Sequence, residues 1–266
     1  MEIERGTILQ TSWVLRVGIA MEFIGHGVLG LGHQPAWTAY FAVMGIPRDT
    51  ALTLMPLIGA FDIAMALLVL FYPARGALLY MAVWGLWTAV LRPLAGESVW
   101  EAVERAGNFG AVAALFLMAR ASGPGSWVRP AGFDMPTAES RVRVCWELRL
   151  TTAGLLMGHG ALGLMVRKPL LAWQYTAVGL PGSRVEPWIG CFECALALAV
   201  LLRPGIGLLT LVLAWKLATE ALSPIAGSPV WVFVEHGGSY AAPLALALLV
   251  RNREDTVSVP LHPSPA

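Results

Sequence analysis

The sequence predicts an all-α membrane protein of about eight transmembrane helices, arranged as two parallel-oriented four-helix repeats. The first observation behind this prediction is composition, because 57% of residues are hydrophobic and only 13% are charged, against about 25% charged in a typical soluble domain. The second is a set of long apolar runs, which are typical of membrane spans. The third is an internal repeat. A formal net charge of +1 gives no reason to expect a nucleic acid as partner, and the lipid bilayer is the expected surrounding.

Short motifs of the first half of the chain return in the second half. Gly25-His26-Gly27 returns as Gly158-His159-Gly160. Recurrence in the same order and at nearly constant separation is the signature of a duplicated unit. Three further motifs recur in this way: Gly59 to Asp62 as Gly190 to Glu193, Pro93 to Gly96 as Pro224 to Gly227, and Trp100 to Glu104 as Trp231 to Glu235.

Four spans are predicted in each repeat. Pro93 and Pro224 are expected to end the third span of each unit, because proline cannot donate the backbone hydrogen bond and crowds the preceding turn. A stretch rich in Gly, Pro and Ser is expected to link the repeats. The predicted spans are 12–31, 54–72, 76–91 and 103–118, then 144–166, 188–202, 206–222 and 232–250. The predicted units are a first repeat over 11–120, a linker over 121–143, a second repeat over 144–250 and a tail over 251–266.

An even number of spans brings both repeats into the membrane from the same side, so the repeats are expected to be parallel. The N-terminus lacks the features of a cleaved signal peptide, and we expect the first span to be retained. The excess of arginine on one side predicts that both termini and the linker lie in the cytoplasm, with the chain in the cell membrane. That side holds Arg5, Arg75, Arg120, Arg129, Arg141, Arg143, Arg203, Arg251 and Arg253, against Arg48, Arg92, Arg105, Arg167, Lys168 and Arg184 on the other.

The outer ends of the spans are expected to carry an aromatic belt and most of the unusual ionisable residues. Ionisable groups at membrane depth are costly, so they usually face a protein interior or a water-filled cavity. Their gathering at one end favours a site, although the same groups would also pair simply to hold helices together. The belt comprises Trp37, Tyr40, Trp100, Trp173, Trp188 and Trp231. The candidate cofactor-binding residues are Glu22, His26, Asp62, Glu104, Arg105, His159, Glu193, Glu235 and His236.

The two histidines of the repeated motif admit three interpretations. Glu22, His26 and His33 fall on one helical stripe, and a carboxylate beside an imidazole leaves the other ring nitrogen free as base or ligand. His26 and His159 are expected at equal depth, so they would serve as metal ligands, for instance to a haem iron between them. The flanking glycines suit close helix packing with interhelical hydrogen bonds instead. The third interpretation is contact with a quinone or another small molecule.

Cys191 and Cys194 form a lone C-x-x-C pair and are the weak candidates for redox catalysis. Pro187 suits the first turn of a helix, which would place Cys191 near a helix N-terminus, where the dipole lowers a thiol pKa. The alternative is two apolar-like buried thiols. Lys216 and Glu220, one turn apart, are expected to form an intrahelical ion pair. Arg16 and Arg149, at matching positions, are expected to extend to the lipid headgroups. These six residues complete the candidates.

The motifs together resemble the DoxX family of four-span bacterial membrane proteins. The resemblance is carried by Arg16, Gly25-His26-Gly27, Gly59-x-Phe61-Asp62 and Arg92-Pro93, and by the segment from Gly96-Glu97 through Trp100-Glu101 to Glu104-Arg105-Ala106-Gly107-Asn108. It extends to both halves, so the chain looks like a tandem DoxX-like protein. The second copy departs from the first, with Leu155 for Glu22, Glu193 for Asp62, His236 for Arg105 and Ser239 for Asn108.

The resemblance implies membrane location and fold, and three classes of function remain open. One named family member is a small subunit of a thiosulfate:quinone oxidoreductase. The first class is therefore an accessory or anchor subunit of a quinone-linked, sulfur-oxidising or other redox complex, with partner subunits and a quinone or haem as possible cofactors. The second class is a membrane chaperone or assembly factor without chemistry. The third class is a small-molecule transporter with a site between the repeats.

Overall fold

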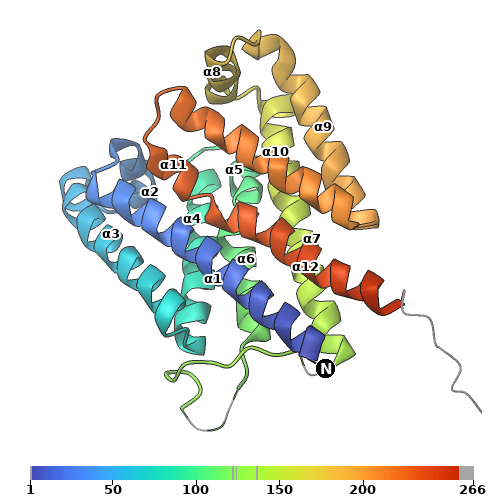
Figure 1. Ribbon diagram of the computed structural model, residues 1–266. Coiled ribbons are helices and arrows are strands. Elements are labelled where there is room, and N and C mark those ends of the chain that lie inside the picture. The colour runs from blue at the N-terminus through green and yellow to red at the C-terminus, as the bar shows by residue number, and fades with distance from the viewer. Residues whose placement is uncertain (1, 122, 124, 136, 258–266) are drawn as a thin grey trace, which may run out of the picture.

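The computed structural model describes residues 2–121, 123, 125–135 and 137–257, and these residues form helices joined by turns and loops (Figure 1). The helices of the first half are α1 (Glu2–Leu31), the 3-10 turn Pro35–Trp37, α2 (Thr38–Val43), α3 (Arg48–Phe71), α4 (Arg75–Leu94), α5 (Val99–Glu104) and α6 (Ala106–Met118). Those of the second half are α7 (Ala138–Ala161), a π-helical stretch Leu162–Val166, α8 (Pro169–Ala177), α9 (Gly182–Leu202), α10 (Ile206–Ile225), α11 (Val230–Val234) and α12 (Gly237–Val257).

Six helical segments of the described chain are long and apolar enough to cross a membrane, which is typical of a membrane protein. They are Arg5–Leu31, Arg48–Phe71, Arg75–Leu94, Gly182–Leu202, Ile206–Ile225 and Val230–Arg251. The expectation of eight spans depends on two further helices that do not meet these criteria. Of these, α6 has 13 residues, and α7 carries the charged Arg143, Glu147 and Arg149.

Each of the eight predicted segments is largely helical, and the predicted C-terminal ends agree well with the structure. Pro93 and Pro224 stand in the last turns of α4 and α10. Beyond them, Gly96 and Gly227 adopt φ of +94° and +97°, a left-handed conformation that glycine adopts without steric cost. Two short helices, α2 and α8, were not predicted. The predicted tail begins as part of α12, and its residues 258–266 lie outside the described part of the chain.

The fourth predicted segment of each repeat is a broken helix. The first breaks at Arg105, between α5 and α6, and the second breaks at Glu235 and His236, between α11 and α12. A break leaves the first N–H groups of α6 and α12 without intrahelical i to i−4 partners. Three ionisable residues at or next to the breaks, Glu104, Glu235 and His236, are buried. Broken helices inside a membrane bundle are tolerated where the irregular backbone is covered by protein or lines a cavity.

The two repeats pack against each other reciprocally. Helix α1 contacts α3 of its own repeat and α12 of the other, and Figure 1 shows α1 and α12 side by side. Helix α7 likewise contacts α9 and α6. Glycines permit this approach, because a Cβ on Gly25 would overlap the backbone of Glu235, and a Cβ on Gly158 would overlap that of Glu104. The largest core cluster accordingly takes residues from both repeats, for example Leu15 of α1 and Leu148 of α7.

Arg16 and Arg149 bind the end of a neighbouring helix. Arg16 Nε donates to Val69 O at 2.9 Å, near the end of α3, and Arg149 donates to Leu201 O at the end of α9. The two guanidinium groups lie 4.0 and 4.2 Å from the ring centroids of Trp13 and Trp146. The last carbonyls of a helix lack intrahelical partners and accept these hydrogen bonds, a role that the sequence did not predict for the two arginines.

Candidate functional site

The first cluster of ionisable residues is built on a His26–Asp62 pair. His26 Nδ1 lies 2.7 Å from Asp62 Oδ2, and Asp62 is completely buried between α1 and α3. The imidazole stacks on Trp37, with ring centroids 4.5 Å apart. A carboxylate that accepts the Nδ1 proton orients the ring and leaves Nε2 available to a ligand.

The broken helices supply the remaining charges of this cluster. Arg105 Nη1 lies 3.7 Å from Glu235 Oε1 across the two breaks. Glu22, one turn before His26 on α1, is also buried. Two buried carboxylate oxygens of the cluster, Glu22 Oε2 and Asp62 Oδ1, lack a hydrogen-bond partner among the described residues.

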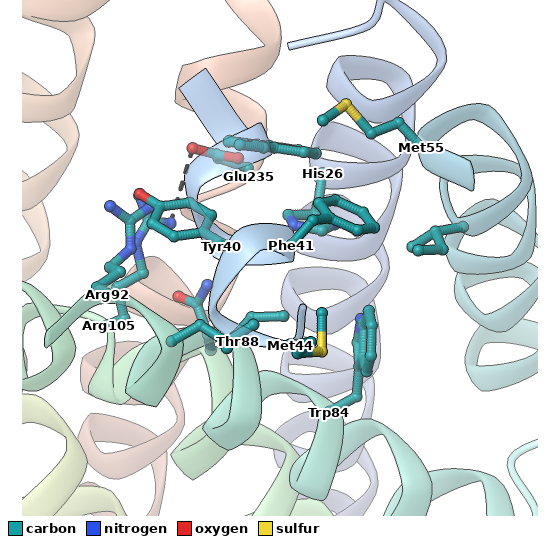
Figure 2. A pocket seen from close by; sticks show the side chains of 14 residues that line it. His26, Tyr40, Phe41, Met44, Met55, Trp84, Thr88, Arg92, Arg105 and Glu235 are labelled. Carbon is teal, nitrogen blue, oxygen red and sulfur yellow. Dashed lines mark ion pairs between the residues drawn. The ribbon is translucent and has the colours of Figure 1, made fainter. Parts of the chain in front are cut away.

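A pocket of about 80 Å³ opens beside this cluster, a volume that holds several water molecules or part of a small ligand. Most of its wall is apolar or aromatic. Figure 2 shows Arg92 and Arg105 gathered beside Tyr40 and Glu235 on one side, with Trp84 and Met55 on the other. The lining residues are His26, Trp37, Tyr40, Phe41, Met44, Met55, Ile58, Trp84, Thr88, Leu91, Arg92, Arg105, Asn108 and Glu235.

The short helix α2 forms one wall of the pocket and is tied to α4 and the following turn. Tyr40 donates from its hydroxyl to Glu97 Oε1 at 2.5 Å, and Arg92 Nη1 lies 3.2 Å from Glu97 Oε2. Burial raises the pKa of Tyr40 to about 12, although nearby Arg92 acts in the opposite direction. Tyr40 therefore keeps its proton near neutral pH and remains the hydrogen-bond donor.

The second cluster repeats the histidine–carboxylate pair of the first with greater burial. His159 Nδ1 lies 2.6 Å from Glu193 Oε2, and both residues are buried between α7 and α9. The indole Nε1 of Trp215 donates to Glu193 Oε1 at 2.9 Å. Glu193, which is one methylene longer than Asp62, thus has both carboxylate oxygens satisfied.

Lys216 gives the second cluster a cation that the first lacks at the matching position, Gly85. Lys216 Nζ lies 2.5 Å from Glu220 Oε1, which confirms the predicted intrahelical ion pair. His236 lies 3.5 Å from Glu220 and 3.7 Å from Glu104. Glu104, Glu220 and His236 are close enough to share a metal ion, but the Lys216 ammonium already pairs with Glu220, and Arg105 lies 3.9 Å from Glu104.

Each cluster includes an acidic residue from the other repeat. Glu104 of the first repeat lies with His236 of the second, and Glu235 of the second lies with Arg105 of the first. Arg105 Nε is also 3.9 Å from Glu104 Oε2, so Arg105 connects the two clusters. The sequence predicted that these positions were related by the repeat, but only the packing shows that the acids are exchanged.

The recorded contacts of the described residues place His26 and His159 in different clusters. Each imidazole is held by a carboxylate of its own repeat, and the pocket is lined by His26 without His159. His33 does not continue the stripe of Glu22 and His26, because α1 ends at Leu31 and His33, at φ +54°, is exposed.

The two cysteines of the C-x-x-C pair are free thiols near the middle of the long helix α9. The structure records Cys191 as exposed and Cys194 as half-buried, without a disulfide between them. The predicted position of Cys191 near a helix N-terminus is wrong, because α9 begins at Gly182 and Pro187 lies inside it. The helix dipole acts only within the first turn, so it does not activate Cys191.

Several pocket residues were not selected from the sequence. Trp37 and Tyr40 were assigned to the aromatic belt, but both turn toward the pocket and His26. Trp84, Arg92 and Asn108 also line the pocket. The sequence does contain a signal that could have identified Arg92 and Asn108 as site residues. It is the difference between the two copies, since the second copy has Ser223 and Ser239 at the matching positions.

Comparison of the chain with models of known protein families, with curated proteins and with solved structures finds no match. The geometry of the first cluster and its pocket is therefore the main indication of function.

Proposed function

We propose that this chain is a tandem DoxX-like membrane protein that binds an amphipathic small molecule of the quinone class in the first-repeat pocket. In this proposal it serves as an accessory or anchor subunit of a quinone-linked redox complex in the cell membrane. The observation that carries the proposal is an aromatic pocket whose polar side includes an imidazole oriented by a buried carboxylate.

A quinone has a flat ring, two carbonyl acceptors and an apolar tail, and the pocket offers a complement to each. Trp84 and Phe41 provide surfaces against which a flat ring can pack. His26, whose Nδ1 is engaged by Asp62, has Nε2 for a hydrogen bond to a carbonyl oxygen. Such concave, mostly apolar sites with a few convergent polar groups are typical of ligand binding.

The difference between the repeats favours one ligand site. In the second repeat the charged Lys216 and Glu220 stand where the first has the small Gly85 and Ala89. The first repeat therefore lacks the internal ion pair that the second repeat has at these positions. A haem held between His26 and His159 is not part of the proposal, because the two imidazoles belong to different clusters.

In the test of quinone binding, a variant of the second repeat serves as the control for a variant of the first. The purified protein is titrated with a short-chain quinone, and quenching of tryptophan fluorescence is measured. His26→Gln is expected to weaken binding about tenfold, the value of one lost hydrogen bond to a ligand. His159→Gln, the matched change in the second cluster, is expected to leave the affinity unchanged.

Equal loss of affinity in both variants, or no saturable quenching in the unmodified protein, would reject a quinone site in the first repeat. The accessory-subunit part of the proposal is tested by purification from native membranes under mild detergent. Co-purification of soluble redox subunits is the expected result, and co-purification of none would contradict that part.

A further inference from the structure

A second, smaller cavity lies beside the first-repeat pocket and shares Thr88 and Asn108 with it, but it adds Glu22 to the lining. Its volume is about 20 Å³, which suits one water molecule or an ion of similar size. Glu22, Thr88 and Asn108 are the lining residues that carry side-chain oxygens. The other lining residues are Phe23, His26, Trp84 and Gly85.

The carboxylate of Glu22 is the feature of this cavity that calls for a ligand. Glu22 is 4% exposed, and its Oε2 lacks a hydrogen-bond partner among the described residues. A buried charge is normally paired or bound to a metal ion. Glu22 Oε2 also lies against Gly238 in the first turn of α12, where the helix dipole favours the ionised carboxylate.

With all three of its carboxylates ionised, the first cluster carries more negative than positive charge. Three buried carboxylates, those of Glu22, Asp62 and Glu235, face one guanidinium, that of Arg105. Protonation of His26 adds one positive charge at most, so one negative charge remains as long as Glu22 is ionised. A single monovalent cation would neutralise it.

The second copy supplies such a cation from its own chain. Lys216, which is 1% exposed, places its ammonium beside Glu220. The matching residue of the first copy, Gly85, has no side chain and lines the small cavity. The first copy thus has a glycine and a small cavity where the second has an ammonium group, and its carboxylate, Glu22, is not at the position that matches Glu220.

We propose that the small cavity binds a monovalent cation of sodium size. The Glu22 carboxylate is the charged ligand, and the Thr88 hydroxyl and Asn108 amide supply neutral oxygens. Hard cations prefer such oxygen donors. Thr88 Oγ1 donates its proton to Gly85 O at 3.0 Å, so its lone pairs remain free to face a cation.

The test is a sodium titration of the purified protein without quinone, with choline replacing sodium at constant ionic strength. Fluorescence of the protein, in which Trp84 lines the cavity, and the thermal unfolding midpoint are both measured. Sodium is expected to change the fluorescence saturably and to raise the midpoint, because a ligand that binds only the folded state stabilises it. Potassium, which is larger, is expected to act at higher concentration.

Three variants assign the effect to this cavity. Glu22→Gln keeps the shape of the side chain and is expected to weaken sodium binding about tenfold or more, as for other losses around a metal site. Asn108→Ala is expected to weaken it less. Ser239→Ala, the matched change in the second copy, is expected to retain the full response.

A response to sodium no larger than that to choline would overturn the proposal. So would an unchanged response in a folded Glu22→Gln protein, which would indicate that Glu22 is buried as the neutral acid. If Glu22→Gln does not fold, Asn108→Ala compared with Ser239→Ala decides the matter. Because no quinone is present, failure here is distinct from failure of the proposed quinone binding.

Discussion

Individual glycines determine how closely the two repeats approach each other. Gly25 and Gly158 flank the two histidines, and each lies against the backbone of an acidic residue from the opposite repeat, Glu235 or Glu104. The same two glycines therefore position the acids that complete each cluster. The histidine motif therefore serves packing and hydrogen bonding together, since its glycines pack helices while its imidazole binds a carboxylate.

Gly158→Ala is expected to destabilise the protein by about 1–3 kcal/mol, because the added methyl group would overlap the Glu104 backbone and force the helices apart. Unfolding in detergent micelles, followed by circular dichroism, measures the loss. Gly207→Ala is the control, since a Cβ there meets nothing within 4 Å. A Gly158→Ala protein as stable as the control would contradict the close packing of α7 on α5.

At the scale of the element, the two repeats differ in whether matching helices carry buried charged side chains. Helices α4 and α10 occupy matching places, but α10 carries Lys216 and Glu220 where α4 carries Gly85 and Ala89. The buried pair on α10 is joined to His236 and Glu104. This ion network links α10 to the breaks between α5 and α6 and between α11 and α12.

Lys216→Met is expected to destabilise the protein by about 3 kcal/mol, because it leaves Glu220 buried without its ammonium partner. The double variant with Glu220→Gln also removes the unpaired charge and is expected to recover part of the loss. The free energy of unfolding of the two variants, measured side by side, tests this. Equal losses would show that Glu220 is not left as an uncompensated charge.

At the scale of the whole molecule, the ionisable residues of the two clusters form one connected region between the repeats. Arg105 reaches toward Glu104 in one cluster and Glu235 in the other. Reciprocal packing of α1 on α12 and of α6 on α7 makes this connection possible. A change in one cluster can therefore affect the other through the broken helices.

The arginine distribution leads us to predict that both termini are cytoplasmic, with α5–α6 and α7 completing eight spans. A C-terminal reporter enzyme that is active only outside the cytoplasm should then be inactive, and a fluorescent protein that folds in the cytoplasm should be bright. An active reporter enzyme would reverse the orientation. If the same fusions made at the N-terminus placed that end on the opposite side of the membrane from the C-terminus, the number of spans would be odd.

Much of the architecture could be predicted from the sequence because membrane helices leave local signals. Apolar runs and Pro93 and Pro224 were enough to locate the helical segments to within several residues, since a backbone in lipid must satisfy its own hydrogen bonds. The Lys216–Glu220 pair was also local, because residues four apart meet on any helix. Paired motifs indicated which positions of the two copies match.

The site itself was decided by the tertiary structure. The exchange of Glu104 and Glu235 between clusters, the inward turn of Trp37 and Tyr40, and the breaks at Arg105 and His236 depend on contacts between segments far apart in the chain. A repeat in the sequence states which residues are equivalent, but not which neighbour each one contacts. Only packing fixes those neighbours, because glycine contacts such as that of Gly158 with Glu104 decide which helices meet.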